Sequence, residues 1–140
     1  MSFEIIEDIV SGDFAFEARG GSLEELFTSC AEACFFAMTD LNKVDATTSR
    51  AIEVEAVNLD DLLFNFLAEL IYLKDTDKLF FNRFEIEIDE DMLVLNAVAR
   101  GERIDYNKHE IKTDVKAVTY HGLQVRNEEG IYKVRVILDL

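Results

Sequence analysis

Asp13 and Asp139 stand near opposite ends of the chain, each at the end of a predicted strand. Asp13 follows a Ser-Gly turn, and Asp139 is the penultimate residue. Each has an ordinary explanation, because turn aspartates bond nearby backbone N–H groups and a terminal carboxylate is solvated. If the first and last strands lie close together, the two side chains converge near the C-terminal carboxylate. Such a group of oxygen atoms suits a hard cation such as Ca²⁺, Mg²⁺ or Mn²⁺.

Lys108 and His109 form a basic pair in a polar segment that follows Gly101-Glu102. The ordinary reading of His109 is a surface histidine that titrates near neutrality. The functional reading is a basic feature on an acidic protein, directed at an anion or an acidic partner. The other histidine, His121, lies on a predicted strand, where a hydrogen-bonded structural role is more common than metal ligation.

Cys30 and Cys34 are four residues apart on the apolar face of a predicted helix. We expect both to be buried, unreactive thiols, because a disulfide across one helical turn has poor geometry. Two cysteines fit a reduced, cytoplasmic protein. The chain carries no Gly-x-Ser-x-Gly, P-loop or dinucleotide-binding motif, so the sequence shows no obvious catalytic apparatus.

Size and charge limit the possible functions. The chain has 140 residues, 49% of them hydrophobic, which is enough for one domain spanning residues 1–140. Its net charge of −15 repels nucleic acid phosphates and anionic membranes, so a role in RNA metabolism would act through a protein partner. The acidic N-terminal segment lacks the positive charges of a signal peptide, and no apolar run reaches the length of a membrane span. We therefore expect a cytoplasmic protein.

Two helices are predicted from apolar spacing and capping residues. The first covers residues 22–38 and begins with a capping box, in which the Glu25 carboxylate is expected to reach back to the Ser22 N–H. The second begins at an Asn58 cap and is followed by a turn at residues 75–78. Its wide apolar stripe predicts burial against a sheet; the stripe comprises Leu59, Leu62, Leu63, Phe66, Leu67, Leu70 and Ile71.

Strands account for most of the remaining chain. Alternating patterns predict strands at residues 3–9, 14–18, 51–57, 81–88, 92–99 and 132–138. The segment 115–125 is β-branched and partly apolar on both faces, which favours an inner strand. Several neighbouring strands are predicted hairpins, so we expect an α+β fold in which two helices cover one face of a mostly antiparallel sheet.

Motifs along nearly the whole chain resemble those of the archease family. The run from Val115 to His121, V-K-A-V-T-Y-H, is similar to the family's signature, as is the ending Leu138-Asp139-Leu140. The remaining matches are Gly12-Asp13, Ser22-Leu-Glu-Glu-Leu-Phe27, Asp61-Leu-Leu63, Glu69-Leu-Ile-Tyr72, Gly101-Glu102 and Lys108-His109. One departure stands out, because Val10 occupies the position of a histidine that is usual in the family.

The resemblance implies an accessory protein and not an enzyme. Archeases activate the RtcB-type RNA ligase of tRNA splicing by assisting its GTP- and Mn²⁺-dependent guanylylation, and they allow multiple turnover. The family's metal-binding carboxylates correspond to Asp13 and Asp139, which implies a bound divalent cation, Ca²⁺, Mg²⁺ or Mn²⁺. Lys108, with its neighbour His109, corresponds to the basic position that serves activation of the partner.

Two alternatives remain open at this stage. One is a chaperone-like module that binds exposed segments of other proteins. The other is a metal-dependent hydrolase that uses the same carboxylates, and phosphatase or nuclease turnover by the isolated protein would favour it.

Overall fold

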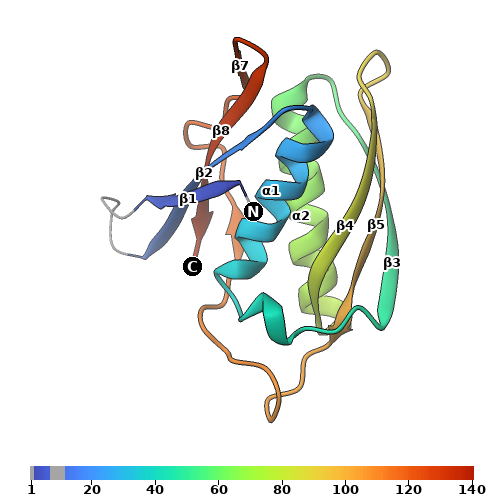
Figure 1. Cartoon of the computed structure of the whole chain (residues 1–140), viewed down its shortest axis with the longest axis vertical. Helices are drawn as coiled ribbons and strands as arrows, with labels where there is room; N and C mark the ends of the chain where they lie inside the picture. Colours follow the sequence, from blue (N-terminus) through green and yellow to red (C-terminus); the bar gives the residue numbers. More distant parts are fainter. Residues whose placement is uncertain (1, 7–11) are drawn as a thin grey trace.

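The computed structural model describes residues 2–6 and 12–140, which form two antiparallel sheets with two helices between them (Figure 1). In the first sheet the strand order is β1 (Phe3–Ile6), β2 (Asp13–Gly20), β8 (Ile131–Asp139) and β6 (Ala117–Val118), and β7 (Arg126–Glu128) also pairs with β8. In the second sheet the order is β3 (Thr48–Glu55), β5 (Val94–Arg103) and β4 (Leu79–Asp89).

The helices α1 (Leu23–Phe36) and α2 (Leu59–Asp77) form the middle layer, and a short 3₁₀ helix, η1 (Leu41–Lys43), follows α1. Helix α1 packs on β2 and β4, whereas α2 packs on β3 and β6. The predicted α+β class with antiparallel strands is confirmed. The helices are nevertheless covered on both sides, because the strands divide into two sheets. Neither helix within the described ranges combines the length and apolar character needed to span a membrane.

Helix α1 begins as predicted at Ser22, whose hydroxyl accepts a hydrogen bond of 3.1 Å from the Glu25 N–H. The Glu25 carboxylate, however, accepts from the Gly21 N–H at 2.7 Å and not from Ser22. The chain reverses sharply here: a Cβ on Gly20 would lie 2.5 Å from the backbone nitrogen of Leu26. This close approach of β2 to the first helical turn, which requires glycine, accounts for the changed donor.

Aromatic and aliphatic side chains from both helices fill the space between the sheets. Phe27 of α1 stacks on Phe66 of α2 with ring centroids 6.1 Å apart, and Phe35 meets Phe81 of β4 edge-on at 5.5 Å. Cys30 and Cys34 are fully buried and unpaired with each other, as predicted. Burial raises the pKa of both thiols, which keeps them protonated and unreactive.

Helix α2 continues through the predicted turn to Asp77 and ends at Lys78, which has the left-handed φ of 56°. The prediction of a turn at residues 75–78 was wrong. Lys74, one helical turn before Lys78, is buried and held by hydrogen bonds, and the helix continues past it. Its ammonium donates to Asp114 at 2.8 Å and to the Val115 carbonyl at 2.9 Å, and it lies 2.7 Å from Asp75. Although burial lowers the pKa of Lys74, these bonds raise it above its ordinary value.

The prediction of an inner strand at residues 115–125 was also wrong. Only Ala117 and Val118 form ladder pairs, and they lie at the edge of the first sheet. The Val115 carbonyl is taken by Lys74, and the Thr119 hydroxyl donates to the Ile137 carbonyl at 2.9 Å. Gly122 then turns the chain with a φ of 63°. The Thr119 N–H still bonds the Ile137 carbonyl at 3.1 Å, so the ladder that β propensity predicted is shortened and not abolished: Lys74 takes the carbonyl before it and the Gly122 turn follows it.

Candidate functional site

Pairing of β2 with β8 places Asp13 directly opposite Asp139. Residues opposite one another in an antiparallel ladder lie on the same face, with Cα atoms roughly 4.5–5.5 Å apart. The Leu140 N–H also donates to the Gly12 carbonyl at 3.3 Å, which holds the C-terminal residue beside the start of β2. The proximity of the two strands, on which the sequence-based interpretation depended, is thus present.

The two aspartates lie on the outer face of the sheet. The neighbouring pair Phe16 and Val136 has the opposite parity, points toward the helices and is fully buried. Asp13 and Asp139 are both exposed. Like charges placed opposite each other destabilise a sheet, so this pairing costs the fold a small amount of free energy. A bound cation would remove that repulsion.

The backbone of Asp139 is fixed from both sides. On one side is Asp13, and on the other Ala117 of β6 is its ladder partner. The Lys116 N–H also donates to the Asp139 carbonyl at 2.8 Å. The aspartate pair therefore stands on two paired strands, β2 and β8, with β6 beside β8, and not on a loop, which gives the carboxylates a rigid base.

The donor set fits an open cation site. Within residues 2–6 and 12–140 no group of three or more His, Cys, Asp or Glu side chains is placed to hold a metal. Ca²⁺ takes six to eight oxygen ligands, whereas Mg²⁺ is commonly held by one or two carboxylates together with waters and substrate phosphates. Two carboxylates beside a C-terminal residue therefore fit Mg²⁺ or Mn²⁺ shared with a phosphate ligand better than a closed Ca²⁺ cage.

The basic pair Lys108-His109 belongs to a second cluster, centred on Glu102. Oxygen Oε1 of Glu102 lies 2.7 Å from Nε2 of His109 and 2.7 Å from Nζ of Lys108, and it accepts from the Asp45 N–H at 3.0 Å. Nδ1 of His109 accepts from the Asp105 N–H at 2.9 Å, which assigns the ring proton to Nε2. His109 is buried, so its interpretation as a surface histidine was wrong.

Lys108 is the accessible member of the second cluster, with 38% of its side chain exposed. Its ammonium also bonds Asp45 at 2.7 Å, so Asp45 and Glu102 hold it from two sides. The bond from Lys108, supported by the Asp45 N–H and His109, lowers the pKa of Glu102 to about 2. Glu102 therefore remains ionised, and its charge is used within the fold.

No pattern in the sequence pointed to Asp45, and Glu102 was noted only as part of the Gly101-Glu102 motif. Asp45 and Glu102 are 57 residues apart in the chain, so no local spacing could have linked them. In the sequence, the feature that best indicates this cluster is Gly101. A Cβ at that position would overlap the Phe80 carbonyl, which indicates that two strands approach closely there.

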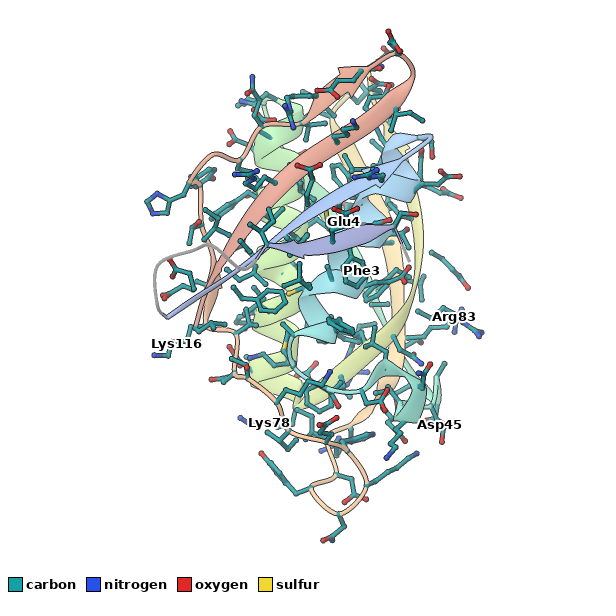
Figure 2. All side chains as sticks on the ribbon, turned by 60° about the vertical axis from the view of Figure 1, so that its left-hand side comes forward. Phe3, Glu4, Asp45, Lys78, Arg83 and Lys116 are labelled. Atoms are coloured by element: carbon teal, nitrogen blue, oxygen red, sulfur yellow. The ribbon has the colours of Figure 1, made fainter. Side chains whose placement is uncertain are left out.

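The two clusters do not meet. Figure 2 shows Asp45, which marks the second cluster, and Lys116, which neighbours Asp139, on different sides of the molecule. His121 is exposed in the segment that follows β6, so its expected role as a bonded strand histidine was wrong. Val10, the departure from the family pattern, lies outside the described residues.

Known proteins are similar to this chain in sequence and fold. The sequence pattern of the Archease protein family matches residues 3–140. The protein archease of Methanothermobacter thermautotrophicus is 41% identical over 133 residues, covering 94% of each chain, and that of Pyrococcus abyssi is 38% identical, covering 93% of this chain and 94% of its own.

Two solved structures have the same architecture. The solution structure of Methanobacterium thermoautotrophicum protein 1598 superposes with a TM-score of 0.85 at 38% identity and covers 99% of both chains. The crystal structure of an archease, possible chaperone, from Thermotoga maritima has a TM-score of 0.69 at 23% identity and covers 98% of both, which shows the fold alone. The family match over nearly the whole chain and the curated relatives lead to one conclusion: the chain belongs to the archease family.

Proposed function

We propose that this chain is an accessory protein that activates an RtcB-type RNA ligase by promoting its guanylylation with GTP and a divalent metal ion. The observation that carries the proposal is the exposed pair Asp13 and Asp139 on adjacent strands. The pair repels itself in the absence of a cation, and it leaves room for ligands supplied by another molecule.

In this proposal Asp13 and Asp139 hold a Mg²⁺ or Mn²⁺ ion toward the nucleotide site of the ligase. The ion supplies positive charge to the phosphates of GTP when it is bound. The rigid strands β2 and β8 keep the two carboxylates in place, so the protein brings an arranged donor pair to its partner. The accessory protein performs no reaction of its own and, with a net charge of −15, does not hold RNA.

Lys108 supplies the second contact with the partner. Asp45 and Glu102 orient its ammonium, while its exposed part remains available to an acidic group of the ligase. His109 supports Glu102 from inside the fold and does not touch the partner. This division differs from the sequence-based expectation, in which both members of the basic pair served activation.

The direct test is a guanylylation assay. An RtcB-type ligase from the same organism is incubated with GTP and Mn²⁺, with this chain present in substoichiometric amounts. We expect faster formation of the ligase–GMP adduct, and repeated activation of ligase molecules by each copy of the chain. An unchanged rate would refute the proposed function.

A second candidate function is a chaperone-like binder of protein segments. The Thermotoga maritima relative is described as a possible chaperone, and this chain exposes several large apolar side chains. They comprise Ile5, Val57, Tyr72, Met92, Tyr106, Ile111, Tyr120 and Ile131. Suppressed aggregation of unrelated unfolded proteins, in the absence of any ligase, would favour this candidate over the first.

A further inference from the structure

The outer face of helix α2 carries an apolar stripe that the sheets cover only in part. Phe64, Ala68 and Tyr72 follow one another at four-residue spacing, and 59% of Tyr72 is exposed. Tyr120, itself 57% exposed, stacks on Phe64 with the ring centroids 3.8 Å apart and the planes 7° apart. This stripe is distinct from the buried stripe of α2 that packs between the sheets.

Edge strands of both sheets flank the stripe. Strand β6 ends the first sheet and β3 ends the second. A hollow of about 280 Å³ lies between the stripe and residues 116–118, and another of about 430 Å³ lies between the stripe and Val54-Glu55 of β3. Ala68 and Tyr72 line both hollows, so the two are parts of one surface, which we call the α2 groove.

The charges that line the α2 groove indicate which kind of molecule can bind there. Glu55, Glu69, Asp75 and Lys116 line it; because Asp75 is already paired with Lys74 at 2.7 Å, Glu55 and Glu69 supply the excess negative charge. The excess of carboxylates repels nucleic acid and anionic lipid. A second copy of the chain would bring the same carboxylates face to face, which disfavours a symmetric dimer through this surface. An apolar segment that carries Lys or Arg is complementary both to the stripe and to its acidic rim.

The position of the groove connects it to the aspartate pair. Ala117 lines the groove and is the ladder partner of Asp139. A protein segment seated against β6 therefore lies one strand away from the proposed metal ligands. We propose that the α2 groove is the docking surface for a basic, partly apolar segment of the ligase; this inference rests on the proposed function. Tyr72, which is exposed and lines both hollows, is its main contact.

The test separates docking from activation by measuring the two independently. Calorimetry gives the Kd for the ligase, and adduct formation at saturating accessory protein gives the maximal rate. We expect Tyr72→Glu to weaken binding about 30-fold, because it removes the aromatic ring that lines both hollows and adds a negative charge beside the acidic rim. The maximal rate should return at high protein concentration. Asp13→Asn should do the reverse, with normal binding and a low maximal rate.

Two further variants serve as controls. Met92→Glu changes an apolar residue that is 70% exposed at the β4–β5 turn and lines neither hollow of the α2 groove, and it should leave the Kd within about twofold of the wild type. Glu69→Lys reverses a charge at the rim without touching the stripe, and should weaken binding several-fold, most strongly at low salt. Thermal unfolding verifies that each variant is folded.

The outcomes distinguish the two proposals. If Tyr72→Glu and Glu69→Lys bind the ligase as the wild type does, while the wild type still accelerates guanylylation, the docking surface lies elsewhere and the accessory function stands. If the wild type neither binds the ligase nor accelerates guanylylation, both proposals are refuted.

Discussion

The two charged clusters of this protein differ in how their charges are compensated. Around Glu102, the carboxylate is matched by Lys108, His109 and a backbone N–H, and the histidine is buried. At the ends of β2 and β8, Asp13 and Asp139 face each other in solvent. The first cluster satisfies its charges within the fold and thereby holds a loop in place. The second leaves two like charges for a ligand to satisfy.

The comparison shows why proximity of charged residues alone does not identify a functional site. The Glu102 cluster has side-chain contacts of 2.7 Å and a strongly lowered carboxylate pKa, yet these features follow from structural ion pairing. The Asp13–Asp139 pair has no such internal compensation among the described residues. Removing charge from the two clusters should therefore have opposite consequences for stability and activity.

The largest expected effect is on activation. Asp13→Asn or Asp139→Asn should reduce stimulation of ligase guanylylation by at least about 100-fold, because one of two metal ligands is lost. Stability to urea should stay the same or rise by a few tenths of a kcal/mol, because the cross-strand repulsion disappears. Glu90→Gln, which neutralises an exposed carboxylate at the β4–β5 turn, is the matched control. Retained activation in both aspartate variants would contradict the metal role.

Substitution of the buried His109 should instead lower stability and leave the affinity for metal unchanged. His109→Ala removes a bond to Glu102 and an edge-on contact with Phe80 at 5.5 Å, and leaves space in the interior. We expect a loss of about 2–4 kcal/mol in the free energy of unfolding, measured by urea denaturation. The folded variant should retain its affinity for Mn²⁺. A loss under about 0.5 kcal/mol would mean that the Glu102 cluster does not support the fold as described.

Lys108 combines features of both clusters, because its ammonium is bonded within the fold while its side chain remains partly exposed. Lys108→Met should leave stability nearly unchanged, since partly exposed ion pairs contribute little. Guanylylation should fall by about tenfold as a contact with the ligase is lost. Lys108→Arg, which keeps the charge, should recover part of the rate. An unaffected rate would leave Lys108 with a structural role only.

The smallest expected effect is a change in pH dependence. The pKa of Glu102 falls from 4.5 to about 2 in the folded protein, so the unfolded state binds more protons between these values. The stability contributed by this carboxylate is fully present above pH 4.5 and is lost as the pH falls through 2. Urea unfolding at several pH values should show a smaller decline for Glu102→Gln than for the wild type. Equal declines would refute this assignment.

Local signals in the sequence predicted the local structure well. The Ser22 and Asn58 caps and the apolar spacing located both helices, because capping and amphipathic periodicity depend on neighbours within a turn. The segment 115–125 was mispredicted since its strand propensity is overridden by distant groups. Lys74, which is 41 residues earlier in the chain, takes the Val115 carbonyl.

The division into two sheets and the arrangement of the sites depend on contacts between distant parts of the chain. Asp13 and Asp139 could be named as candidates from the sequence, but only the ladder between β2 and β8 shows that they face each other. No local pattern could link Asp45 to Glu102 or reveal that His109 is buried. The α2 groove likewise exists only because two sheet edges end on either side of one helix.

The most direct test of the central claim is to locate Mn²⁺ on the protein by paramagnetic broadening of backbone amide signals. Substoichiometric Mn²⁺ should broaden the signals of Asp13, Phe14, Ala117 and Asp139, while those of Glu102 and Lys108 stay sharp. Asp13→Asn should abolish the effect. Broadening centred on the Glu102 cluster, or unchanged broadening in Asp13→Asn, would contradict the assignment of Asp13 and Asp139 as the metal ligands.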